Sequence, residues 1–106
     1  MSKQIVKKLS IAAGLILAMS SSVYALDGAE VYTSKGCAGC HGADAKTPIM
    51  GAYPKIAGQN LDYTIQQLTD IKSGTRSNGQ SAAMKGIMAA VNKDEIKAVA
   101  TYLSGL

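Results

Sequence analysis

Hydrophobic residues recur at helical spacing in two stretches of the chain. Asn60 is suited to cap a helix, and after it apolar residues recur every three or four positions until Gly74. A second face follows Asn92, with Glu95 three residues later as in a capping box, and ends before Gly105. The first face consists of Leu61, Ile65, Leu68 and Ile71, and the second of Ile96, Val99, Ala100 and Leu103.

A third, shorter helix is predicted over residues 27–36. Asp27 can cap its start, Glu30 suits its first turn and Gly36 ends it. Residues 42–59 are rich in proline, glycine and small polar residues, and residues 75–91 open with an Arg-Ser-Asn-Gly run, so both segments are predicted loops. No stretch alternates apolar and polar residues as a strand would. The pattern therefore predicts an all-α fold of three main helices and long loops.

The first 25 residues have the pattern of a secretory signal peptide. Three lysines precede an apolar run over residues 9–19, and small residues stand at Val23 and Ala25 before a cleavage site. The alternative is an uncleaved membrane anchor, but the run is shorter than the roughly 20 residues that span a bilayer. We therefore expect residues 1–25 to be removed, residues 26–106 to form one domain, and the protein to reach the periplasm of a Gram-negative bacterium.

Removing this leader lowers the net charge and leaves a short domain with few aromatic residues to form a core. The chain has 106 residues, a formal net charge of +4, five Tyr, no Trp and no Phe. Without the leader's three lysines, Lys and Arg fall from 11 to 8 against 7 Asp and Glu, which leaves +1. Nucleic-acid binding loses its main support. A domain this small and poor in aromatic residues is expected to need a disulfide, a metal or a cofactor to stabilise it.

The motif Cys37-Ala38-Gly39-Cys40-His41 offers that stabilising group. A disulfide between Cys37 and Cys40 closes a very small loop, a thioredoxin-like pair expects a preceding strand, and a zinc site lacks further Cys or His ligands. Thiols at this spacing can instead bind the two vinyl groups of one haem, with His41 as the proximal iron ligand. His41 is the sole histidine of the chain. The motif predicts one covalently bound haem c with its iron.

The sixth position of the iron can be open, as in gas-binding haems and peroxidases, or can hold a methionine, as in electron carriers. Outside the leader the chain offers Met50, Met84 and Met88. Met50 is close in sequence to the His41 side, whereas Met84 and Met88 both lie in the second predicted loop. Met84 precedes Lys85-Gly86, where glycine permits a close backbone approach, so spacing favours Met84 over Met88.

Seven pieces of the chain, in order, resemble the class I cytochromes c, and more narrowly one domain of the dihaem periplasmic cytochromes c. They are Gly36–Gly42, Tyr53–Gln59, Tyr63, Gln67–Gly74, Arg76–Asn78, Met84–Ile87 and Asp94–Leu103. The resemblance covers essentially all of residues 26–106. It implies a small cytochrome c fold around one haem, although this chain contains one haem motif where the dihaem relatives have two.

The same resemblance implies roles for individual residues. His41 is the proximal ligand and Met84 the distal ligand, with Met88 in reserve. The carbonyl of Pro54 accepts the imidazole N–H of His41, and Gly28 and Tyr32 lie where the first helix crosses the last, at Tyr102 and Leu103.

The expected function is therefore one-electron transfer in the periplasm, without catalysis, between a donor and an acceptor protein, such as a membrane-bound oxidase or reductase. Lys35, Lys46, Lys55 and Lys85 are candidates to surround an exposed haem edge and attract an acidic partner. Three alternatives stay open: a cytochrome subunit of a larger enzyme such as a flavocytochrome, a peroxidase or gas-binding haem protein, and a thiol–disulfide module.

Overall fold

The computed structural model describes residues 26–106, and the predicted signal peptide over residues 1–25 lies outside the described residues. The described part is all-α and contains no strand, which confirms the predicted fold class. Within residues 26–106, no helix has the length and hydrophobicity needed to cross a membrane. The five helices are α2 (Gly28–Ser34), α3 (Ala38–His41), α4 (Leu61–Ser73), α5 (Ser81–Met88) and α6 (Lys93–Ser104).

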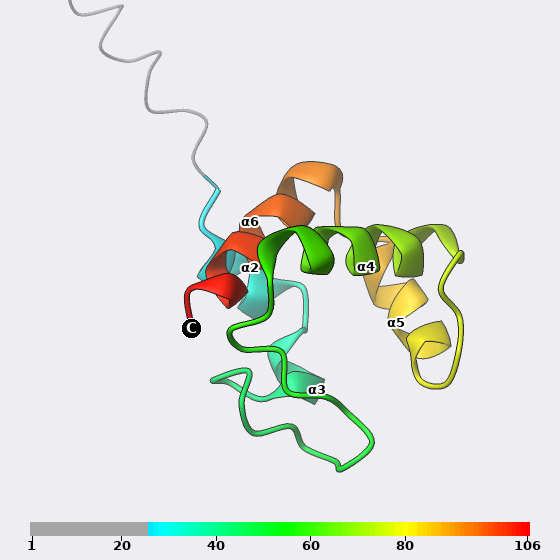
Figure 1. The fold of residues 1–106 in the computed structure, drawn as a ribbon, viewed down its shortest axis with the longest axis horizontal. Helices are drawn as coiled ribbons and strands as arrows, with labels where there is room; N and C mark the ends of the chain where they lie inside the picture. Colours follow the sequence, from blue (N-terminus) through cyan, green and yellow to red (C-terminus); the bar gives the residue numbers. More distant parts are fainter. Residues whose placement is uncertain (1–25) are drawn as a thin grey trace, which may run out of the picture.

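The helices are arranged around α4. In Figure 1, α4 runs across the middle of the molecule from α2 at one end to α5 at the other, with part of α6 above it and α3 below it. Helix α6 packs against both α2 and α4, and α5 packs against α4. This arrangement sets α3 and α5 at separate edges of the molecule.

Local capping explains where the three predicted helices begin. The Asp27 side chain accepts the Ala29 N–H at 3.0 Å, and the Asn60 side chain accepts the Tyr63 N–H at 2.9 Å. At α6, Asn92 and Glu95 form both halves of a capping box. These side chains provide acceptors for N–H groups that have no partner within the first turn of a helix. The predicted starts are therefore confirmed.

The loop predicted over residues 75–91 is wrong in its second half, where Ser81–Met88 forms α5. A helix of eight residues is marginal on its own, and Gly79 and Gly86 make the local pattern resemble a loop. Packing against α4 supplies the missing stability, which local sequence does not reveal. As a result, Met84 and Met88 lie one helical turn apart rather than in a loop.

The hydrophobic core is divided into two clusters. The first joins α2 to α6 and consists of Val31, Tyr32, Ala45, Val99 and Leu103. The second joins α4, α5 and α6 and consists of Ile71, Met88, Val91 and Ile96. Leu68 of α4 packs against both.

Helices α2 and α6 cross at Gly28, as the resemblance implied. A Cβ atom at Gly28 would lie 2.1 Å from the Ala98 carbonyl oxygen and 2.7 Å from Cβ of Tyr102. The Tyr32 and Tyr102 rings lie 5.7 Å apart between centroids. Only glycine permits this close approach, which places the end of α2, and the Cys37 motif after it, against α6.

Candidate functional site

A cavity of about 410 Å³ lies between the two core clusters, since residues of both clusters line it. Most other lining side chains are apolar, among them Ile56 and Leu68. The lining also includes every predicted site residue: Cys37, Cys40, His41, Pro54, Met84 and Met88.

His41 is buried and held in one orientation. Its Nδ1 atom lies 2.9 Å from the carbonyl oxygen of Pro54, a residue 13 positions later in the loop between α3 and α4. A carbonyl oxygen only accepts hydrogen bonds, so Nδ1 carries the proton and Nε2 keeps a free lone pair. An imidazole held this way is suited to bind a metal through Nε2.

Cys37 lies directly before α3 and Cys40 lies within it. The Cys37 carbonyl oxygen accepts the backbone N–H groups of Cys40 and His41 at 3.3 and 3.0 Å. Burial raises the pKa of the Cys37 thiol. Reactive redox cysteines have lowered pKa values, and the described residues place no strand before the motif. The site therefore does not favour a thiol–disulfide module.

The three candidate methionines occupy different surroundings. Met50 is 54% exposed and does not line the cavity. Met88 is 3% exposed and belongs to the core cluster of Ile71, Val91 and Ile96. Met84 is half-buried, packs only at the edge of that cluster and lines the cavity. Met84 and Met88 therefore both line the cavity, but Met88 also belongs to the buried core cluster, whereas Met84 lies at its edge.

Tyr32 supports the turn that follows His41. Its hydroxyl donates to the Gly42 carbonyl oxygen at 2.6 Å, and the same oxygen accepts the Ala45 N–H at 3.2 Å. Gly42 has a φ of 90°, and a Cβ there would lie 2.2 Å from the Thr47 carbonyl oxygen, so the turn requires glycine. The Asp44 carboxylate accepts the Lys46 and Thr47 N–H groups, which hold the pKa of that carboxyl below its usual range.

We expect Tyr32→Phe to lower the free energy of unfolding by about 1 kcal/mol at neutral pH, the usual net value of one hydrogen bond. Burial raises the pKa of Tyr32 to about 12, so the folded protein holds the phenol proton more tightly than the unfolded chain does. Wild-type stability should therefore fall between about pH 10 and pH 12, by an amount on the order of 3 kcal/mol. Because this loss exceeds the deficit of the variant at neutral pH, denaturant titrations across this range should show that deficit closing and then reversing as pH rises.

The matched control is Tyr63→Phe, because the Tyr63 side chain is 54% exposed. This variant should follow the wild-type stability at every pH. If Tyr32→Phe and wild type instead lost stability in parallel above pH 10, Tyr32 would not be the group that titrates.

One edge of the cavity is polar, which sequence reasoning did not anticipate. Arg76, Asn78, Gln80 and Ser81 line it, and Arg76 Nη1 donates to Oε1 of Gln67 at 3.0 Å. The only signal in the sequence is the Arg-Ser-Asn run that follows the Gly74 turn. Its position beside the cavity depends on the packing of α5 against α4.

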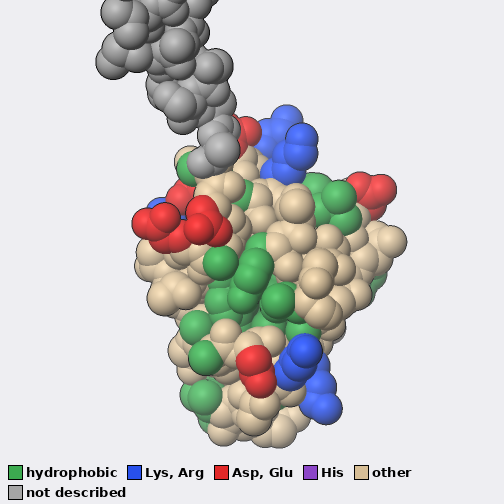
Figure 2. Space-filling model, turned by 90° about the vertical axis from the view of Figure 1, so that its left-hand side faces the viewer, with side chains coloured by type: hydrophobic (Ala, Val, Ile, Leu, Met, Phe, Trp, Pro, Cys, Tyr) green, Lys and Arg blue, Asp and Glu red, His purple; other side chains and the backbone are tan. Residues whose placement is uncertain are grey.

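The four lysines predicted to surround an exposed haem edge do not all lie in the same kind of environment. Lys46, Lys55 and Lys85 are exposed, but Lys35 is half-buried and donates to the Ala90 carbonyl oxygen at 2.8 Å. Lys35 also forms an ion pair with Glu95 at 3.3 Å. Lys35 therefore has an internal role. The face in Figure 2 carries hydrophobic side chains at its centre and both acidic and basic side chains toward its edges.

The residues present fit a haem covalently bound through the two thiols. Cys37, Cys40 and His41 line the same cavity, as do the two methionines Met84 and Met88. The mainly apolar lining suits a large flat ring, and the polar edge suits its charged substituents. Imidazole and thioether are the usual axial ligands of iron in electron-carrying haems.

Comparison with known proteins agrees with this chemistry. The family model described as Cytochrome c matches residues 25–106. Cytochrome c-553 from Nitratidesulfovibrio vulgaris is 35% identical over 104 residues, which cover 98% of this chain and 99% of that protein. A thiosulfate dehydrogenase electron acceptor from Stutzerimonas stutzeri is 39% identical over 101 residues, which cover 89% of this chain and 44% of that protein.

Solved structures agree on the fold. Reduced cytochrome c4 from Pseudomonas stutzeri matches with a TM-score of 0.65 and 32% identity, over 74% of this chain and 46% of that chain. The chain thus spans less than half the length of several relatives that it matches. The match to the family model, the relative aligned over its full length and the cavity at Cys37, Cys40 and His41 establish that the chain belongs to the cytochrome c family, with haem c as the cofactor that its cysteine motif implies.

Proposed function

We propose that this cytochrome c is a one-electron carrier in which His41 and Met84 are the axial ligands of the haem iron. One observation carries the proposal: Met84 and Met88 both line the cavity of His41 and the two cysteines, but Met88 is buried in the core, whereas Met84 is only partly buried at the edge of that core. A second protein ligand leaves no open position for a substrate. This favours electron transfer over peroxidase or gas-binding chemistry.

Haem c supplies a one-electron couple between ferric and ferrous iron. The chain's own residues tune that couple. The Pro54 carbonyl orients His41 through Nδ1 and increases the basicity of its ring. The Met84 thioether would raise the reduction potential of the bound haem, and the apolar lining would keep water away from its iron. Keeping the same two ligands in both oxidation states limits structural change on electron transfer.

We also propose that the carrier works in the periplasm after removal of residues 1–25. The pattern of this leader supports the proposal, as does a family match that begins at residue 25, beside the predicted cleavage site. The partners would be a donor and an acceptor protein. Two relatives are named as thiosulfate dehydrogenase electron acceptors, which makes a dehydrogenase a reasonable class of donor for this chain.

The test is to purify the protein from the periplasm of cells that attach haem c. We expect the mass of residues 26–106 plus one haem, a one-electron titration, and reduced protein that binds carbon monoxide slowly and weakly. Fast and tight binding of carbon monoxide would contradict methionine ligation and favour a gas-binding or peroxidase function. Stoichiometric co-purification of a flavoprotein would identify the chain as an enzyme subunit instead of a free carrier.

A further inference from the structure

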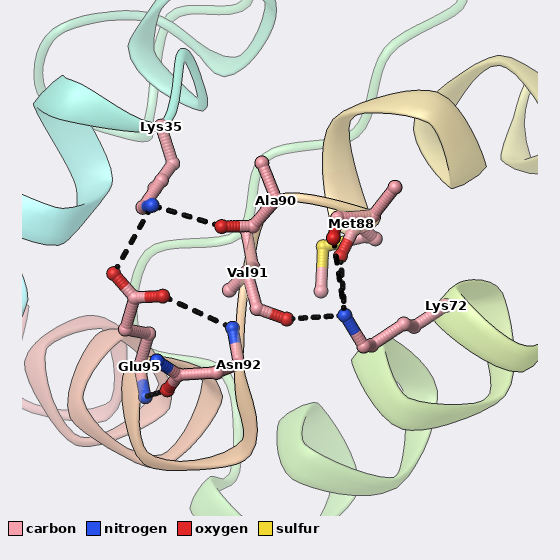
Figure 3. Close-up of polar contacts among 8 residues, drawn as sticks. Lys35, Lys72, Met88, Ala90, Val91, Asn92 and Glu95 are labelled. Carbon is pink, nitrogen blue, oxygen red and sulfur yellow. Dashed lines mark hydrogen bonds and ion pairs between the residues drawn. The ribbon is translucent and has the colours of Figure 1, made fainter.

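Lys72 connects α4 to the end of α5. Its ammonium group donates to the carbonyl oxygens of Val91 at 2.6 Å, Met88 at 2.9 Å and Ala89 at 3.5 Å (Figure 3). An ammonium group has three N–H donors, and here each has a carbonyl acceptor. Cations are also favoured at a helix C-terminus, where carbonyl groups lack partners.

Lys35 holds the one remaining carbonyl of the same segment. It donates to Ala90 at 2.8 Å and pairs with Glu95, whose other carboxylate oxygen accepts the Asn92 N–H at 3.0 Å (Figure 3). The carbonyl oxygens of all four residues from 88 to 91 therefore accept from two lysines. We call Lys35 and Lys72 the lysine clamp.

The clamp joins both sides of the site. Lys35 lies two residues before Cys37, and Lys72 lies on α4. The segment that they hold, residues 88–91, begins at the last residue of α5, the helix that carries Met84. Ordering a lysine side chain costs conformational entropy, and an exposed lysine usually remains mobile and hydrated. Because two lysine side chains are ordered on residues 88–91, we expect the position of this segment to be important for the site.

Within its own segment, the C-terminal end of α5 is fixed by turn hydrogen bonds, in which the N–H groups of Ala89, Ala90 and Val91 donate to carbonyl oxygens of α5. The helix is eight residues long, and its end cap, Ala89, has no glycine-type turn. Met88, its last residue, is held by core packing and by Lys72. Met84 is one turn earlier on the same face, so a displacement of the helix end also displaces Met84.

We infer that Lys72, assisted by Lys35, is a positioning residue that holds α5 so that Met84 stays at the haem iron. This inference rests on the proposed His41 and Met84 ligation. Loss of the clamp lets the end of α5 move, so that an external ligand competes more easily with the thioether. The clamp thereby sets how readily the sixth position of the iron opens.

The test is a titration of the ferric haem protein with imidazole. Binding is measured as the loss of the long-wavelength charge-transfer band of methionine-ligated haem. We expect Lys72→Met to bind imidazole about tenfold more tightly than wild type, because hydrogen bonds from a charged donor are lost. Lys72→Arg, which keeps a cationic donor, should restore most of the wild-type affinity. Lys97→Met is the matched control, because Lys97 is an exposed lysine on α6 with the same charge change.

The outcomes distinguish a failure of the proposed iron ligation from a failure of the lysine clamp. A wild-type ferric protein without the methionine band would overturn the ligation on which this inference rests. Wild type with the band, together with an unchanged imidazole affinity in Lys72→Met, would overturn the clamp even if that variant unfolded more easily. If Lys72→Met does not accumulate, Lys72→Gln provides the same comparison, with a weaker neutral donor and an expected intermediate affinity.

Discussion

Replacing Met84 by alanine is expected to remove the methionine-ligated signature of the ferric protein and to lower its reduction potential. The thioether raises the potential of haem iron, so its loss should cost on the order of a tenth of a volt, within the roughly 0.8 V range that axial ligands span. The reduced variant should also bind carbon monoxide rapidly. Optical spectra in both oxidation states and a potentiometric titration measure these effects.

Met88→Ala provides the matched control, because it removes the same side chain one turn further along α5. Met88 is 3% exposed and packs against Ile71, Val91 and Ile96. This variant should keep the methionine-ligated spectrum but lose about 2–5 kcal/mol of stability, as large-to-small core substitutions do. If Met88→Ala alone lost the spectral signature, Met88 would be the ligand and the assignment of Met84 would be wrong.

Adding one methyl group at Gly28 is expected to destabilise the whole domain. In Gly28→Ala the new Cβ would lie 2.1 Å from a backbone oxygen of Ala98, and backbone cannot move aside as a flexible side chain can. Helices α2 and α6 must separate, which should cost about 3 kcal/mol. For a domain of this size the midpoint of thermal unfolding should fall by more than about 10 °C.

The control for this experiment is Gly39→Ala, at an exposed position of the short helix α3. A Cβ at Gly39 meets no atom within 4 Å, and Gly39 does not line the cavity. The unfolding midpoint of this variant should stay near that of wild type. A midpoint for Gly28→Ala equal to that of Gly39→Ala would show that the helix crossing is looser than the structure describes.

Local interactions account for most of what could be predicted of the fold. Asn60, Asn92 and Glu95 cap helices through residues three positions away, so their effect is visible in the sequence. Helix α5 was missed because eight residues with an internal glycine carry a weak local pattern, and its stability comes from α4. Lys35 was expected on a partner-binding surface, although its true acceptor is 55 positions away at Ala90.

The sequence by itself determined where a haem attaches, because Cys37, Cys40 and His41 lie within five consecutive residues and the covalent chain fixes their spacing. It also determined the all-α class through helical periodicity and caps. Only the tertiary structure decided that Met88 is part of the buried core while Met84 lies at its edge, that His41 and Pro54 come within hydrogen-bond distance, and that two lysines hold the end of α5. These features depend on contacts between residues far apart in the chain, which form only when the helices pack.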